Sequence, residues 1–340
     1  MDGFLNVAKP AGWTSHDVVA KIRRLLRTKR AGHAGTLDPD ATGVLVVAVG
    51  QATRLLPHLN LEPKVYRAVC GFGLATTTED ASGEITEQAD ASALTEDALL
   101  AALPAFLGEI SQVPPMVSAL HHNGQRLYDL ARKGIVVERE PRTVSIHGLE
   151  LLGFAPGERA SAELRVTCGG GTYIRTLCKD LGAALGLPAH MASLVREAVG
   201  NFALESAVTL EDVTELALLP MQDALGWPTF SVDDVTAAEL RLGRKIPHPS
   251  PCPFPQRVSD FVGAREGERT SSDSPSRPDE VGNRPRGGRG ECFAALHNGA
   301  LLALLRREGD TLHPFAVFTS PQTPPNLGAG GQIIGAGGQE

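Results

Sequence analysis

Segments with strand spacing and segments with helix spacing are mixed along this chain without a regular strand–helix–strand rhythm. This irregular mixture favours an α+β fold over a doubly wound parallel sheet. Apolar alternation and buried runs predict strands at Phe4–Lys9, Val44–Val49 and Val65–Phe72, and two more between Thr143 and Thr167 around a turn near Pro156 and Gly157. Helical spacing predicts a helix capped by Thr14 or Ser15 with the apolar stripe Val18, Val19, Ile22, Leu25 and Leu26, a second over Thr95–Leu107, and a third over Ile174–Leu185 that stops at Gly186.

The length of 340 residues fits a large domain followed by a small one. Pro, Ser, Gly and charged residues crowd positions 247–289, which predicts a flexible insertion. Strand-like apolar character returns at Ala294–Leu305 and Thr311–Phe318, so we expect a small β-rich module that the insertion interrupts. We therefore predict a main domain at 1–228, the module at 229–320 and a flexible tail at 321–340.

The five cysteines are scattered and include no C-x-x-C pair. This spacing excludes a dense disulfide scaffold, gives no zinc-ribbon pattern and favours a reducing, cytoplasmic compartment. The first residues show no basic segment followed by an apolar one, as a secretory signal would. The longest clean apolar run, Val44–Val49, is too short to cross a bilayer, so we expect a cytoplasmic protein without membrane contact.

Charge is unevenly distributed. The whole chain has a net charge of −7, yet residues 1–70 hold ten basic and five acidic residues. Six of the bases fall between positions 21 and 30: Lys21, Arg23, Arg24, Arg27, Lys29 and Arg30. A local basic surface binds phosphates whatever the global charge, so these six are candidate contacts to a nucleic-acid backbone. The alternative is a solvated helix face with no partner.

The segment Ala31–Gly43 is rich in glycine and contains His33, Asp38 and Asp40. Ionisable groups in a glycine-rich loop after a basic helix more often have a functional role than none. The spacing matches neither a Walker loop nor a dinucleotide-binding fingerprint. A metal held by His33 and Asp38 lacks an evident third ligand, and Asp38 alone is equally well explained as a turn residue or helix cap.

The sequence Gly32-His33-Ala34-Gly35-Thr36-Leu37-Asp38-Pro39-Asp40-Ala41-Thr42-Gly43-Val44-Leu45 resembles the catalytic signature of the bacterial tRNA pseudouridine-55 synthases, the TruB family. Four further stretches occur in the order of that family: Leu5-Asn6-Val7-Ala8-Lys9-Pro10, Lys64-Val65-Tyr66-Arg67, Val117-Ser118-Ala119-Leu120 and Gly171-Thr172-Tyr173-Ile174-Arg175-Thr176. The resemblance covers residues 4–215 and rests on several separated motifs.

The resemblance implies a mixed-sheet pseudouridine synthase fold followed by a PUA-like RNA-binding module. It also implies that Asp38 is the nucleophile, that Arg175 pairs with it, and that His33, Tyr66, Tyr173 and Leu194 contact a flipped-out nucleotide. From the residues alone, Tyr66 and Tyr173 could equally be half-buried aromatics, and Leu194 would be assigned to the core. Two features depart from the family pattern: the insertion at 247–289, and Val195-Arg196 in place of paired arginines, which suggests that one phosphate contact is lost.

The expected substrate is the T arm of tRNA, in which uridine at position 55 becomes pseudouridine. The reaction cuts the N1–C1′ bond, turns the uracil and rejoins it through C5, so it requires no cofactor and no metal. An Asp carboxylate is ionised at neutral pH unless burial raises its pKa, and Arg175 would oppose that rise. Tyr66 would stack on the uracil or relay a proton, which places it with Asp38 and Arg175 among the catalytic candidates.

Two other functions remain open. One is a tRNA-binding folding helper in which catalysis is secondary, and the other is a metal-dependent hydrolase that uses His33 and Asp38. No protein partner is implied, and we expect a monomer.

Overall fold

The computed structural model describes residues 1–116, 121–122, 125–126, 135, 137–248 and 291–318. The chain forms two compact units, Met1–Leu219 and Pro220–Glu340. The stretch Val117–Leu120 noted above, most of the expected insertion and the expected tail lie outside the described residues.

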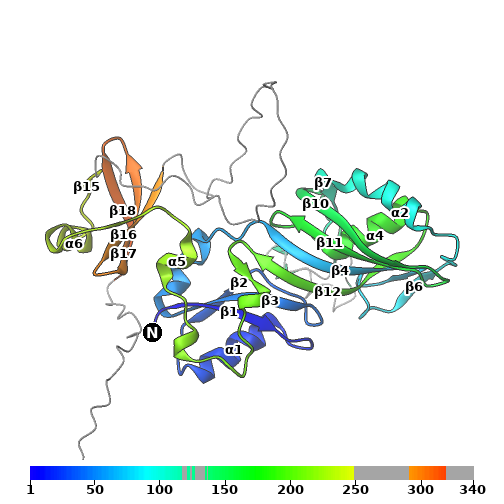
Figure 1. Ribbon diagram of the computed structural model, residues 1–340, viewed down its shortest axis with the longest axis horizontal. Coiled ribbons are helices and arrows are strands. Elements are labelled where there is room, and N and C mark those ends of the chain that lie inside the picture. The colour runs from blue at the N-terminus through cyan, green and yellow to red at the C-terminus, as the bar shows by residue number, and fades with distance from the viewer. Residues whose placement is uncertain (117–120, 123–124, 127–134, 136, 249–290, 319–340) are drawn as a thin grey trace, which may run out of the picture. The chain divides into compact units, whose positions relative to one another are not determined.

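A nine-stranded mixed sheet forms the centre of the first unit (Figure 1). Its main path runs in the order β1-β3-β12-β4-β11-β10-β7, with β2 paired to β3 and β13 paired to β12. The strands are β1 (Gly3–Lys9), β2 (Ala31–Ala34), β3 (Thr42–Val49), β4 (Lys64–Phe72), β7 (Gly108–Gln112), β10 (Arg142–Ala155), β11 (Ser161–Cys168), β12 (Ala189–Val199) and β13 (Phe202–Ala203). Two small sheets lie beside it, β5 (Leu74–Thr76) with β6 (Ile85–Gln88), and β8 (His121–His122) with β9 (Gln125–Arg126).

The strand patterns explain where the core lies. In β4, Tyr66, Ala68, Cys70 and Phe72 alternate with more exposed residues, so one face of the strand is buried. In contrast, β3 is apolar along nearly its whole length because both of its faces are covered. The pairing of β3 with β12 is parallel, in a sheet whose other pairings are antiparallel in the described residues.

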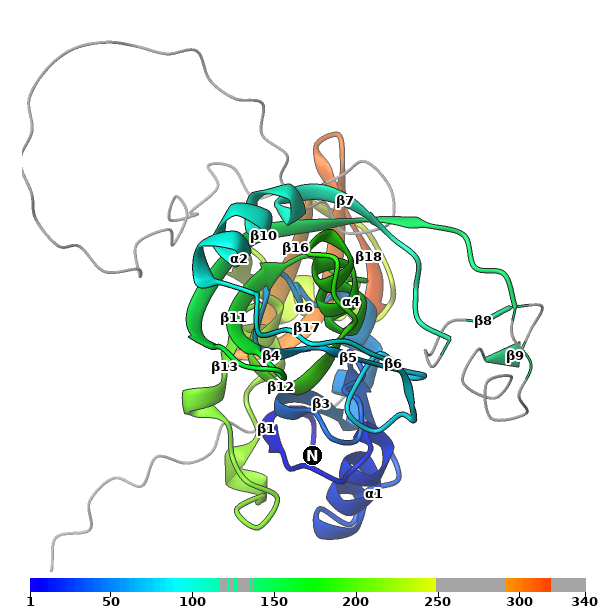
Figure 2. The same ribbon diagram turned by 90° about the vertical axis from the view of Figure 1, so that its right-hand side faces the viewer.

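Helices cover the sheet in two places (Figures 1 and 2). The helix α1 (Ser15–Leu25) packs Val18, Val19 and Ile22 against β1 and β3. The helices α2 (Glu96–Ala102) and α4 (Ile174–Ala184) share a second apolar cluster with β4, β11 and β12. A capping box between Thr14 and Asp17 starts α1. These interactions confirm the predicted strand at Phe4–Lys9 and the Thr14 cap.

Three local predictions need correction. Leu25 is exposed and does not belong to the buried stripe of α1. The helix expected over Thr95–Leu107 ends at Ala102, because Pro104 cannot continue it, and a 3-10 turn (Leu103–Phe106) follows. The expected loop Ala31–Gly43 begins with a short strand, β2, which pairs with the far half of β3.

The second unit contains a five-stranded sheet in the order β14-β16-β17-β18-β15. Its elements are α5 (Met221–Leu225), β14 (Thr229–Ser231), α6 (Asp234–Arg241), β15 (Ile246–Pro247), β16 (Cys292–His297), β17 (Ala300–Glu308) and β18 (Thr311–Val317). The expected strand-like stretch Ala294–Leu305 forms a hairpin, with Asn298 and Gly299 at positive φ in its turn. Short 3-10 turns at Gly50–His58, Leu204–Ser206 and Glu215–Ala217 complete the described elements of the first unit.

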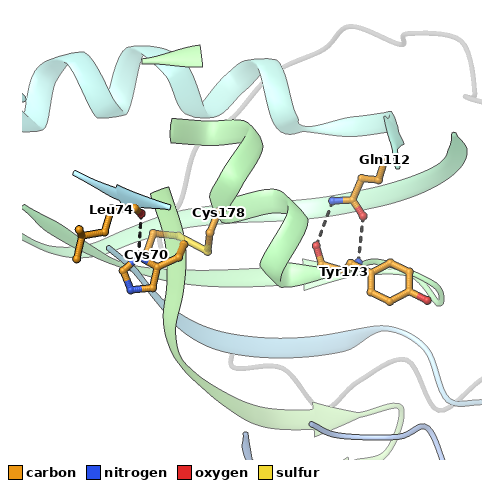
Figure 3. The surroundings of a disulfide bond; sticks show 6 residues. Cys70, Leu74, Gln112, Tyr173 and Cys178 are labelled. Carbon is orange, nitrogen blue, oxygen red and sulfur yellow. Dashed lines mark hydrogen bonds between the residues drawn. A yellow bond between two sulfur atoms is a disulfide. The ribbon is translucent and has the colours of Figure 1, made fainter. Parts of the chain in front are cut away.

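A disulfide joins Cys70 on β4 to Cys178 on α4 (Figure 3). The sequence analysis did not predict it, because the two cysteines are 108 residues apart and their pairing depends on the folded sheet.

Candidate active site

Asp38 lies in the turn between β2 and β3, and hydrogen bonds on both sides hold that turn. The hydroxyl of Ser15, at the start of α1, accepts from the Leu37 amide at 3.0 Å and donates to the Leu37 carbonyl at 3.2 Å. The Pro39 carbonyl accepts from the buried Lys9 ammonium at 2.8 Å and from the Gly12 amide at 3.0 Å. The residues before and after Asp38 are therefore anchored to the end of β1 and the first turn of α1.

Arg175, in the first turn of α4, forms a two-point ion pair with Asp38. Its Nε lies 3.1 Å from Oδ2 and its Nη2 lies 3.2 Å from Oδ1, which fixes the plane of the carboxylate. The arginine side chain is 5% exposed and that of Asp38 is 37% exposed, so the pair is open to solvent only on the carboxylate side. Burial raises the pKa of the Asp38 carboxyl, while the Arg175 guanidinium opposes the rise.

A turn between β5 and β6 holds the other side of the Arg175 guanidinium. The Thr78 carbonyl accepts from Nη1 at 3.2 Å, and the Asp80 carboxylate lies 3.8 Å from the same nitrogen. Asp80 in turn accepts hydrogen bonds from the hydroxyls of Thr78 and Ser82, both at 2.6 Å. Glu79, at a positive φ of 61°, ties this turn to α4 through Lys179 at 2.6 Å.

Tyr66, on β4, is buried, and burial raises the pKa of its phenol. The positive charge of the Arg196 guanidinium opposes this rise. Asp38 is near enough to Tyr66 to act on the same pKa. Asp38, Arg175 and Tyr66, which the sequence analysis grouped, thus come from three distant segments and meet at one place.

The other predicted nucleotide contacts lie around this group. Leu194, on β12, is buried in the same apolar cluster as Tyr66 and Leu37. Tyr173 precedes α4, and the buried side chain of Gln112 clamps its backbone: the amide of Tyr173 donates to Oε1 at 3.0 Å and its carbonyl accepts from Nε2 at 3.2 Å (Figure 3). His33, on β2, is half-buried and meets the ring of His16 edge to face at 5.2 Å. Burial lowers the pKa of the His33 imidazole.

The six basic candidates do not all lie on one helix. α1 ends at Leu25, so Arg27, Lys29 and Arg30 lie in the link to β2. Lys21 is half-buried and the other five are exposed, although Arg23 also donates to the Ala31 carbonyl. Arg196, which follows Val195 where the family has paired arginines, is buried and bonded to backbone carbonyls.

The sequence analysis missed Asp80, Glu79 and Gln112, which support Arg175 and Tyr173. The only local signal was a run of turn-forming residues at Thr76–Gly83. Within the described parts of the chain, no three His, Cys, Asp or Glu side chains gather as a metal site would require. No helix in those parts is long and apolar enough to cross a membrane.

The nine-stranded mixed sheet, with Asp38 and Arg175 paired beside it, defines the class of fold. A chain in the crystal structure of a Cbf5–Nop10–Gar1 complex has the same fold, with a TM-score of 0.61 and 26% identity over 93% of this chain and 85% of that one. A chain of an H/ACA ribonucleoprotein, in a complex with a substrate RNA containing 2′-deoxyuridine, has a TM-score of 0.61 and 24% identity over 94% of this chain and 85% of that one.

Sequence comparison identifies the family. Residues 23–174 match the N-terminal domain of the TruB family pseudouridylate synthases, and residues 175–225 match the tRNA pseudouridylate synthase B C-terminal domain. The tRNA pseudouridine synthase B of Symbiobacterium thermophilum is 52% identical over 72% of this chain and 82% of its own length. That of Thermobifida fusca is 48% identical over 71% of this chain and 84% of its own. This chain belongs to the TruB family of pseudouridylate synthases.

Proposed function

We propose that this protein is a tRNA pseudouridine synthase that isomerises uridine 55 in the T loop, with Asp38 as the nucleophile. The two-point ion pair between Asp38 and Arg175 carries the proposal. Relatives of about half-identical sequence are named tRNA pseudouridine synthase B, which supports the substrate class.

The geometry suits attack by a carboxylate. Arg175 favours the ionised form of Asp38 and orients both of its oxygens, while the partial exposure of Asp38 leaves room for a sugar or a ring. The attacked atom is either C1′ of the ribose or C6 of the uracil, and the arrangement serves both routes. Either route breaks the N1–C1′ bond and re-forms the link at C5.

The target uridine must leave its stack before Asp38 can reach it, at a cost on the order of a few kcal/mol that is least for a loop nucleotide. We propose that His33 takes the vacated place in the RNA and that Tyr66, Tyr173 and Leu194 line the pocket for the flipped base. The exposed bases among positions 21–30 would bind phosphates without reading sequence. Single-stranded RNA loops with splayed bases suit this mode of recognition.

We further propose that residues 1–228 form the catalytic domain and that 229–320 form a PUA-like RNA-binding module with its insertion at 247–289, followed by a tail at 321–340. We propose that the protein acts in the cytoplasm as a monomer.

Replacing Asp38 by Asn tests the central step. On tRNA with tritium at uracil C5, Asp38→Asn should lower tritium release by a factor on the order of 10⁴–10⁶, while the Kd for tRNA stays close to that of the wild type. Asp40→Asn, in the same turn, serves as the matched control and should release tritium at a rate near the wild-type rate.

Other results would favour other functions. Normal tritium release from Asp38→Asn would contradict the proposed nucleophile. If the wild type binds and refolds tRNA but releases no tritium, the folding-helper function is correct instead. Loss of turnover on addition of EDTA would favour the metal-dependent hydrolase.

A further inference from the structure

Arg196 carries a positive charge into the interior of the first unit. Its side chain is 1% exposed, and among the described residues no carboxylate lies within ion-pair distance of it. Its hydrogen-bond partners are neutral backbone carbonyls: that of Val44 at 2.7 Å from Nε and that of Gly35 at 3.0 Å from Nη2. Burying a cation without a counter-ion costs folding free energy, and an apolar residue in a purely structural position would cost less folding free energy.

The two carbonyl partners of Arg196 lie at the two ends of the Asp38 turn. Gly35 lies three residues before Asp38, and Val44 lies just past the end of the turn. A side-chain carbon on Gly43 would come within 2.2 Å of the Arg196 carbonyl oxygen, and one on Gly35 would lie 3.4 Å from Nη1. The turn therefore closes onto Arg196 at both ends, which requires glycine at Gly43.

The strand register places Arg196 opposite both halves of the site. On one side of β12, Arg196 pairs with Gly43 of β3 in parallel, and on the other side it pairs with Tyr66 of β4 in antiparallel. The Arg196 guanidinium thus bonds to both ends of the turn that carries the proposed nucleophile, and Tyr66 is the register partner of Arg196 on the neighbouring strand.

We propose that Arg196 is a positioning residue for the isomerisation: it holds the Asp38 turn and the Tyr66 hydroxyl in one geometry and stabilises the Tyr66 oxygen when that oxygen takes the C5 proton of the substrate. This inference rests on the proposed function. It assigns Arg196 no direct contact with RNA.

On the route in which Asp38 attacks C1′, C5 still holds its hydrogen after it has bonded to C1′, and the ring has an N1=C6 double bond. The Tyr66 phenolate takes the proton, the C5–H electron pair becomes the C5=C6 bond, and the N1=C6 pair moves to N1, which takes a proton from water. Tyr66 is left as a neutral phenol, which loses its proton to solvent before the next turnover. A nearby cation makes the phenolate less costly to form.

Several charged or titratable groups face this phenol or its arginine. Arg196 on β12, Cys168 on β11 and Asp38 in the turn act on Tyr66, and Lys64 on β4 is close enough to act on Arg196. Burial raises the pKa of the Cys168 thiol to about 11, so it is uncharged at neutral pH. Burial is the largest influence on Tyr66 and raises the pKa of its phenol, and among these groups the Arg196 guanidinium opposes that rise.

The test compares Arg196→Met and Arg196→Lys with the wild type on tRNA whose target uridine carries hydrogen or deuterium at C5. We expect kcat to fall about 100-fold in Arg196→Met and about 10-fold in Arg196→Lys, with little change in KM. Because C5 deprotonation becomes the slow step, deuterium should slow Arg196→Met more than it slows the wild type. In a plot of rate against pH, the rise on the alkaline side should also lie at higher pH for Arg196→Met than for the wild type.

Arg159→Met is the control, because Arg159 likewise donates to two backbone carbonyls, those of Gly73 and Ala89, but is exposed in the turn between β10 and β11. It should keep the wild-type kcat and isotope effect. A slow Arg196→Met with an unchanged isotope effect and pH profile, or a normal kcat in that variant, would overturn the inference. If the wild type itself forms no pseudouridine, the proposed function fails instead.

Discussion

At the scale of single residues, the site depends on how Asp38 is oriented and charged. Arg175 is itself held by the Thr78 carbonyl and the Asp80 carboxylate, so its guanidinium cannot follow the carboxylate if Asp38 moves. A planar guanidinium that is bonded on both sides orients a carboxylate better than a single ammonium group does.

The pKa of Asp38 should determine where activity is lost on the acid side of the pH–activity profile. The active form is the carboxylate, which is lost as the pH falls through a pKa that burial has raised. Removing the opposing charge in Arg175→Met raises this pKa further, so half-maximal activity on the acid side should move to higher pH. Arg175→Lys should move it less but still lower the rate. Single-turnover rates between about pH 5 and pH 8 measure this, and an unmoved acid limb would contradict it.

The supporting residues could not have been predicted one at a time. Asp38, Tyr66 and Arg175 were predicted from motifs, because each lies in a short pattern that is recognisable by itself. Arg196 and Gln112 act on residues that are distant in sequence, and nothing in their neighbourhoods indicates those partners.

At the scale of elements, the sequence predicted strands better than helix ends. The alternation along β4 and the apolar run of β3 are strong local signals, and both strands lie within two residues of the expected bounds. β2 was missed because Ala31–Ala34 contains no β-branched residue, so only its pairing with β3 makes it a strand. The turn at Thr76–Gly83 is held by α4, through Glu79, and by backbone hydrogen bonds to Met191 on β12.

The disulfide links two elements of the site. Cys70 lies four residues after Tyr66 on the same face of β4, and Cys178 lies one turn after Arg175 on α4. Replacing both cysteines by alanine should lower the free energy of unfolding by about 2–4 kcal/mol relative to the oxidised protein. Urea unfolding with and without dithiothreitol measures this. The double variant is its own control, since the reductant should not change its stability. Equal stability of the oxidised wild type and the double variant would argue against the disulfide.

At the scale of the whole molecule, the basic segment at positions 21–30 contrasts with a net charge of −7. If these side chains bind phosphates, the affinity for tRNA falls steeply with salt, because each contact contributes about 0.7–0.9 to the slope of log K against log salt. The pair Arg27→Gln and Lys29→Gln should reduce that slope by about 1.5. Arg165→Gln, whose charge is already paired with Glu197, should leave it unchanged. A slope that is flat in the wild type would contradict the assignment.

The mixed sheet could be predicted from the sequence as an α+β class, but its strand order could not. That order depends on one parallel contact, where Thr42 and Gly43 meet Val195 and Arg196. No local pattern predicts a pairing between segments separated by some 150 residues, since its stability comes from the sheet as a whole.

The same parallel contact has a consequence during synthesis. The nucleophile candidate is translated among the first forty residues, yet the strand that closes its turn leaves the ribosome only after nearly two hundred. Pairings between such distant segments form late, because a long loop must close before they stabilise anything. A nascent chain that stops before Arg196 would have Asp38 on a turn that β12 does not yet hold. The site can therefore become active only near the end of the translation of the first unit.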